Sequence, residues 1–171
     1  MDFPGNMTVG ALVRERALQH PERTYLVFEG ANGALGGLTY GELDSQTNAI
    51  ANELISAGLR KGDRALVMLR NSIEFVLAVM AGAKAGIVTV PVNTASVRSD
   101  LRHVLDLVEP RAVIYHTEYA SLATSEAANR STVSVSVVVG ASPDLVGASP
   151  DLNDGTGHIA WPELLSGSVH P

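Results

Sequence analysis

The chain has 171 residues, 46% hydrophobic and 18% charged, which fits one globular domain with its own core. The formal net charge of −6, with no basic tract, argues against a protein that holds nucleic acid by its phosphates. There is no cysteine, so disulfides, cysteine–zinc sites and thiol nucleophiles are excluded for this sequence.

Targeting and membrane signals are also missing. The start of the chain, Met1 to Asn6, has neither a basic segment nor an apolar core, so no secretory signal is expected. The longest apolar stretch, Phe75 to Ala83, is far shorter than the about 20 residues of a membrane-spanning helix. We therefore expect a cytoplasmic protein with no transmembrane segment and no nucleic-acid partner.

The first predicted unit is a helix followed by a hairpin, over residues 8–40. Thr8 is a suitable cap for the helix, and His20 with the proline after it ends it. Residues 24–29 alternate as a strand does, and after a glycine-rich turn residues 35–40 return as a second strand.

Repeated helix–strand units are predicted over residues 41–139. Thr39 and Glu42 have the spacing of a capping box, and Gly58 is placed to end that helix. Asn71 and Glu74 have the same spacing before a second helix, which Gly86 ends. The predicted strands of this region are 65–69, 87–92, 112–115 and 133–139. This alternation predicts an α/β fold with a mainly parallel sheet and crossover helices.

The remaining chain is predicted to be less regular. Residues 140–157 form a loop that carries a tandem repeat, Gly-Ala-Ser-Pro-Asp-Leu, starting at Gly140 and again at Gly147. The terminal segment, 158–171, is expected to include a short helix from Trp161 to Leu165.

No nucleotide-binding or hydrolase motif accounts for this chain. The glycines between residues 30 and 37 are spaced for a hairpin loop rather than for a dinucleotide fingerprint. Neither a Walker A sequence nor a G-x-S-x-G elbow is present. Among the five histidines, His116 follows a predicted strand, where active-site groups often lie in open α/β sheets. A plain surface residue is the simpler interpretation of His116.

Four short segments in a fixed order are similar to those of a known family. They are Thr39 to Leu43, Gly58 to Arg64, Asn71 to Phe75 and Lys84 to Asn93. Together they resemble the amino-terminal part of the adenylate-forming (AMP-binding) superfamily, which includes acyl-CoA synthetases, luciferases and peptide-synthetase adenylation domains. The resemblance covers roughly residues 8 to 140 and implies that the fold is the amino-terminal subdomain of such an enzyme.

The resemblance implies an ATP-dependent acid–CoA ligase, an enzyme of fatty acid metabolism. Complete members use ATP, Mg²⁺ and CoA to make an acyl-adenylate and then a thioester. Their Ser/Thr/Gly-rich phosphate loop ending in Pro-Lys, and the motifs that follow it, do not occur in these 171 residues. We therefore expect residues 1–171 to be a partial ligase domain that is inactive alone, with no catalytic residue, metal site or cofactor of its own.

One loop has a counterpart on the CoA side of the family. In members similar to acetyl-CoA synthetase, the loop after the second motif contacts the CoA nucleotide, and here it is Asn93, Thr94 and Ala95. Arginines that assist this contact in the family have no equivalent between Ser121 and Thr124.

The expected partners are the remainder of the ligase or a second copy of the chain, bound through exposed apolar surface. Three alternatives stay open. The chain is a non-catalytic interaction module, a fragment of a peptide-synthetase adenylation domain, or a nucleotide-binding α/β domain unrelated to ligases.

Overall fold

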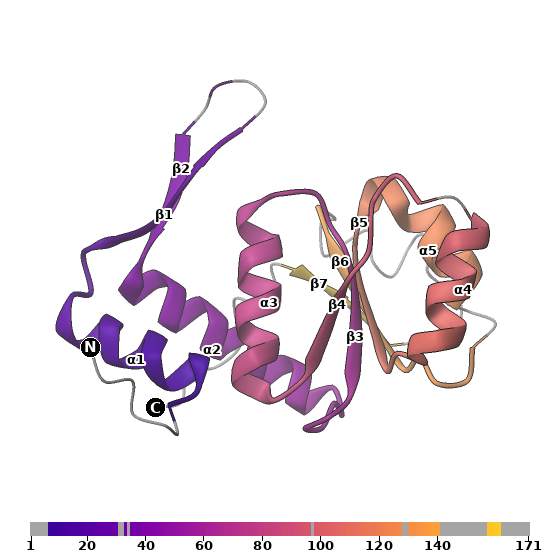
Figure 1. Ribbon diagram of the computed structural model, residues 1–171, viewed down its shortest axis with the longest axis horizontal. Helices are drawn as coiled ribbons and strands as arrows, with labels where there is room; N and C mark the ends of the chain where they lie inside the picture. Colours follow the sequence, from indigo (N-terminus) through magenta and orange to yellow (C-terminus); the bar gives the residue numbers. More distant parts are fainter. Residues whose placement is uncertain are drawn as a thin grey trace.

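The computed structural model describes residues 7–30, 33, 35–96, 98–127, 130–140 and 157–161. A five-stranded sheet lies between two layers of helices, and a separate two-stranded hairpin stands away from this body (Figure 1). None of the helices in the described ranges is long and apolar enough to span a membrane.

The amino-terminal helix and hairpin form as predicted. Helix α1 spans Val9–Gln19, and the hydroxyl of its cap, Thr8, accepts a hydrogen bond from the Ala11 amide at 3.1 Å. Strand β1 (Thr24–Glu29) pairs antiparallel with β2 (Leu35–Thr39).

Helix α2 (Tyr40–Ser56) begins with the predicted capping box. The Thr39 hydroxyl accepts from the Glu42 amide at 3.2 Å, and the Glu42 carboxylate accepts from the Thr39 amide at 2.8 Å. Two otherwise unpaired amides at the helix start are thereby satisfied. Gly58, just beyond the end of α2, has a φ of +102°, a left-handed conformation that glycine adopts without steric cost.

The predicted capping box of the next helix is wrong by one residue. Helix α3 spans Ile73–Ala85, and its cap is Ser72, whose hydroxyl accepts from the Phe75 amide at 3.2 Å. Asn71 therefore lies one position outside the cap. At the other end Gly86 has a φ of +71°, as its predicted role as a helix stop requires.

The large sheet is entirely parallel, which confirms the predicted fold class. Its strands lie in the order β4-β3-β5-β6-β7. Strand β7 was not predicted from the sequence and extends the sheet beyond β6. The elements are β3 (Arg64–Met68), β4 (Val88–Pro91), α4 (Arg98–Val108), β5 (Ala112–His116), the 3₁₀ turn η1 (Thr117–Tyr119), α5 (Ala120–Ala127), β6 (Val135–Val139) and β7 (Gly157–Ala160).

Side chains that alternate along each strand fill two separate cores, because successive residues point to opposite faces of a sheet. In β5, Ala112 and Ile114 belong to the core under α1, α2 and α3, whereas Val113 and Tyr115 belong to the core under α4 and α5. Figure 1 shows these two groups of helices on opposite sides of the sheet. This arrangement explains the nearly continuous apolar runs of the strands.

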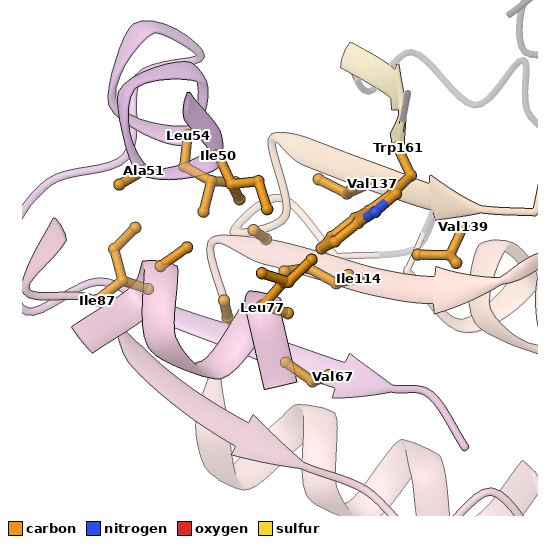
Figure 2. Close-up of a cluster of buried hydrophobic side chains, with 14 of the residues drawn as sticks. Ile50, Ala51, Leu54, Val67, Leu77, Ile87, Ile114, Val137, Val139 and Trp161 are labelled. Carbon is orange, nitrogen blue, oxygen red and sulfur yellow. The ribbon is translucent and has the colours of Figure 1, made fainter. Parts of the chain in front are cut away.

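Trp161, directly after β7, completes the first core. Its side chain is 6% exposed, and Figure 2 shows the indole ring pointing into the cluster beside Ile114 and Val137. The rest of the helix predicted from Trp161 to Leu165 lies outside the described residues, as does nearly all of the tandem repeat in the loop 140–157.

Candidate functional site

The described structure has a pocket at the carboxyl ends of the parallel strands. From β3 the chain crosses first to β4 on one side and then to β5 on the other, so the order of the strands reverses between β3 and β5. Open α/β sheets bind their ligands at such a switch point. The pocket has a volume of about 380 Å³ and is lined by Leu69, Arg70, Ser72, Glu74, His116, Glu118, Val139, Gly140 and Trp161.

Arg70 connects the end of β3 to the segment that follows β5. Its guanidinium lies 2.8 Å from the Glu118 carboxylate, and its Nε donates to the Tyr119 hydroxyl at 2.8 Å. The hydrogen bond to Tyr119 and the negative charge of Glu118 raise the pKa of Arg70 above its ordinary value. Because 69% of the Arg70 side chain is exposed, water screens this pair, and we assign it to positioning.

His116, the last residue of β5, also contacts Glu118. Its Nδ1 accepts a hydrogen bond from the Glu118 amide at 3.3 Å and lies 3.5 Å from the Glu118 carboxylate. On the other side of the ring is Gly140, after β6, with a φ of +81°. A Cβ at Gly140 would lie 2.6 Å from His116 Nε2, so glycine is what makes room for the imidazole.

The polar groups of this pocket are mostly engaged with one another. Arg70 and His116 both bind Glu118, and the Ser72 hydroxyl caps α3. Ser72 is the single hydroxyl among the nine lining residues, and its oxygen is taken up by the Phe75 amide. The pocket thus presents mutually satisfied groups rather than a nucleophile activated by a general base.

The residues that line this pocket do not fit the cofactors of the family. No group of three or more His, Cys, Asp or Glu residues in the described part of the chain is arranged to hold a metal ion such as Mg²⁺. The Arg70 guanidinium and the His116 ring, which both line the pocket, each contact Glu118. We therefore derive no step through ATP or Mg²⁺ on these residues.

The loop predicted on the CoA side, Asn93 to Ala95, follows β4 and does not line the pocket. The Asn93 side-chain oxygen accepts from the Ala95 amide at 2.9 Å, which makes a local turn. The next cation along the chain, Arg98, is bound to Ser125 and Glu126, at 2.8 Å each. CoA contact at this loop stays a prediction, and these bonds supply no free guanidinium for it.

A buried acid joins the two helices on the far face of the sheet. The Glu126 carboxylate of α5 is 5% exposed and pairs with Arg98 at 2.8 Å and Arg102 at 3.1 Å, both from α4. Hydrogen bonding from Arg102, with a further bond from Arg98, lowers the pKa of Glu126 despite its burial. This cluster holds α4 against α5.

Sequence reasoning located part of the candidate site. It placed His116 after a strand, and the structure brings this residue to the pocket. It missed Arg70, Glu118 and Trp161 as neighbours of His116. The available signal was the position of Arg70 and Glu118 just beyond β3 and β5, since the carboxyl ends of parallel strands meet at one edge of the sheet.

Comparison with known proteins identifies the family. Residues 13–159 match the model of the family described as AMP-binding enzyme. The chain is 33% identical over 122 residues to surfactin synthase subunit 2 of Bacillus subtilis, a match that covers 71% of this chain and 3% of that protein. It is 35% identical over 114 residues to the mitochondrial medium-chain acyl-CoA ligase ACSF2 of Mus musculus, covering 67% of this chain and 18% of that protein.

The fold agrees with this assignment. The structure of acetoacetyl-CoA synthetase from Streptomyces lividans superimposes with a TM-score of 0.82 at 19% identity, over 96% of this chain and 26% of that one. The 171 residues thus span a small part of the length of these proteins. By the family match over most of its length, the chain belongs to the AMP-binding, or adenylate-forming, enzymes and corresponds to an amino-terminal portion of them.

Proposed function

We propose that this chain is the amino-terminal part of an ATP-dependent acid–CoA ligase and that it supplies the scaffold rather than the chemistry. The observation that carries the proposal is that the residues of the family-like segments have structural roles. Thr39 caps α2, Gly86 ends α3 in a left-handed conformation, and Asn93 closes a local turn. In this proposal the complete enzyme uses ATP, Mg²⁺ and CoA, and its fatty or other carboxylic acid substrate is selected elsewhere.

The pocket supports the inactivity of the isolated chain. Phosphoryl and adenylyl transfer depends on positioned cations and backbone donors around the phosphates. Here Arg70 and His116 are bound to Glu118, and the 171 residues contain no glycine-rich phosphate loop ending in Pro-Lys.

A chimera tests the scaffold role. The aligned stretch of the mouse acyl-CoA ligase is replaced by this chain, and formation of acyl-adenylate and acyl-CoA is measured with medium-chain acids. We expect a folded chimera that retains both steps. A chimera that folds, as shown by its thermal unfolding, but makes no acyl-adenylate contradicts the proposal.

The similarity to surfactin synthase supports a second candidate, a fragment of a peptide-synthetase adenylation domain. The two candidates differ in the acceptor of the acyl group. In a second chimera, this chain replaces the aligned stretch of a surfactin synthase adenylation domain. The second candidate is favoured if this chimera loads a carrier protein while the ligase chimera is inactive.

We further propose that the partner of the chain is the remainder of the ligase and that it covers the β1–β2 hairpin. Val27 of β1 and Leu35 of β2 are 64% and 74% exposed, and Figure 1 shows the hairpin standing free of the sheet. Two strands alone are only marginally stable in water, so an apolar hairpin of this kind is expected to be covered. In the isolated chain the same surface would drive self-association.

A further inference from the structure

His116 presents one atom to two different groups of the same residue. Its Nδ1 lies 3.3 Å from the Glu118 amide nitrogen and 3.5 Å from the Glu118 carboxylate oxygen Oε1. The amide can only donate a hydrogen bond, and the ionised carboxylate can only accept one. When Nδ1 is unprotonated, it therefore accepts a hydrogen bond from the amide. When Nδ1 is protonated, it can instead donate a hydrogen bond to the carboxylate.

The neutral ring has a defined tautomer in this arrangement. Because Nδ1 accepts from the Glu118 amide, the proton of the neutral imidazole is on Nε2. In this state His116 is the amino-terminal cap of η1, the turn that leads from β5 into α5. Protonation of the ring removes the lone pair on which this cap depends.

We propose that His116 is a proton-operated cap that changes the conformation of the η1 turn at the mouth of the pocket. With a neutral ring, Nδ1 holds the Glu118 amide and the turn is closed. With a protonated ring, the Nδ1–H group donates to the Glu118 carboxylate, and the amide loses its partner. The local structure at Glu118 then differs between the two protonation states.

Charged groups around the His116 ring act on its protonated form in opposite directions. The Glu118 carboxylate stabilises the imidazolium, and the Arg70 guanidinium, bound to the same carboxylate at 2.8 Å, opposes it. Glu74 of α3 lines the same pocket and adds a second negative charge, and the Tyr119 hydroxyl is hydrogen-bonded to Arg70. Histidine is the side chain that most often changes its charge between about pH 5 and 8, which is the range over which the two states are compared.

Glycine after β6 leaves the space beside the ring open. A Cβ at Gly140 would lie 2.6 Å from His116 Nε2, so a side chain there would displace the ring. The response to protonation is expected at the two groups near Nδ1, the Glu118 amide and the Glu118 carboxylate.

Nuclear magnetic resonance of the full 171-residue chain tests this inference. The ring nitrogens of His116 report the tautomer and the titration, and the Glu118 amide reports the cap through its hydrogen-exchange protection, normalised to the intrinsic rate at each pH. We expect the proton on Nε2 in the neutral ring. We expect protection of the Glu118 amide to fall about fivefold as His116 becomes protonated, which is the loss of one ordinary hydrogen bond.

Two variants complete the test. In His116→Asn the side-chain oxygen can cap without titrating, so protection of the Glu118 amide should not change between pH 5 and 8, a range of about three units around the ordinary histidine pKa. His103→Asn, at an exposed histidine of α4, should leave the pH response intact. A neutral ring with its proton on Nδ1, or a Glu118 amide that does not follow the His116 titration in the unaltered chain, overturns the proposal whether or not the variants fold.

Discussion

The ammonium group of Lys84 on α3 donates a hydrogen bond to the carboxylate of Asp44 on α2 at 2.6 Å, and only 10% and 19% of the two side chains are exposed. The same ammonium donates to the side-chain oxygen of Asn48 at 2.7 Å and to the backbone oxygen of Asp44 at 3.1 Å. Burial lowers the pKa of Lys84, while the Asp44 carboxylate opposes this effect. The pair thus joins two helices of the first core and includes a lysine from one of the family-like segments.

Removing the acid should cost more than removing the base. In Asp44→Ala the ammonium stays buried without its counter-ion, and we expect a loss of about 3 kcal/mol in the free energy of unfolding. In Lys84→Met the apolar stem is kept and the more exposed carboxylate regains water, so the expected loss is about 1 kcal/mol. Urea unfolding measures both. Equal losses for the two variants would contradict the assignment of a charge-dependent role to this pair.

The acid-side stability of the domain should depend on Glu126. Its pKa is lowered in the folded chain by Arg102 and Arg98, so the unfolded chain binds the proton more tightly. The contribution of Glu126 is therefore fully present above the unfolded-state pKa and is lost as the pH falls through the folded-state pKa. We expect Glu126→Gln to unfold at lower urea concentration than the unaltered chain at pH 7, and the difference to shrink in acid.

A control for this prediction is Glu109→Gln. Glu109 also pairs with an arginine, Arg64, but 67% of the Glu109 side chain and 46% of the Arg64 side chain are exposed, so this ion pair should contribute little. If the two variants show the same pH dependence, the special position of Glu126 between α4 and α5 is not supported.

The end of α3 should require glycine at position 86, because the backbone there is left-handed. Gly86 has a φ of +71°, and Gly86→Ala should cost about 1–2 kcal/mol because an L side chain is strained there. Gly36→Ala is the matched control, since Gly36 lies on the exposed hairpin and its Cβ would make only an ordinary contact, 3.4 Å from Ile73. That control should change the unfolding free energy by less than about 0.5 kcal/mol. A Gly86 variant as stable as the control would contradict a conformational role.

The exposed hairpin should control self-association of the isolated chain. Val27→Lys together with Leu35→Lys should reduce binding of a hydrophobic dye and shift the chain toward a monomer in light scattering. Leu107→Lys, at a residue of α4 that is 76% exposed, is the control and should have a smaller effect. If the unaltered chain is already a monomer and binds no dye, the proposed role of the hairpin is contradicted.

Local signals predicted most of the fold. Capping residues such as Thr8 and Thr39, and glycines such as Gly86, act within four residues of their own position, so the sequence near them is sufficient. The displaced cap of α3 shows the limit of this reasoning. Asn71 and Ser72 are adjacent residues of nearly equal capping preference, so capping preference alone does not distinguish between them.

Features that depend on distant parts of the chain were not predicted. Strand β7 is a four-residue segment without a strong strand pattern, and its pairing with β6 is what defines it. The Arg70–Glu118 pair, and the place beside His116 that requires glycine at position 140, bring together residues from separate strand ends. Positions at strand ends predict that such groups gather at one edge of the sheet, but the partners follow from the strand order.

The central claim is that the chain is a scaffold of an adenylate-forming enzyme and does not itself adenylate. ATP–pyrophosphate exchange by the purified chain, across a panel of carboxylic acids, tests it most directly. Trp161 is the single tryptophan and is buried, so its blue-shifted fluorescence verifies in the same sample that the sheet is folded. We predict no exchange above background with any acid by the folded chain, whereas exchange that depends on a carboxylic acid would contradict the account.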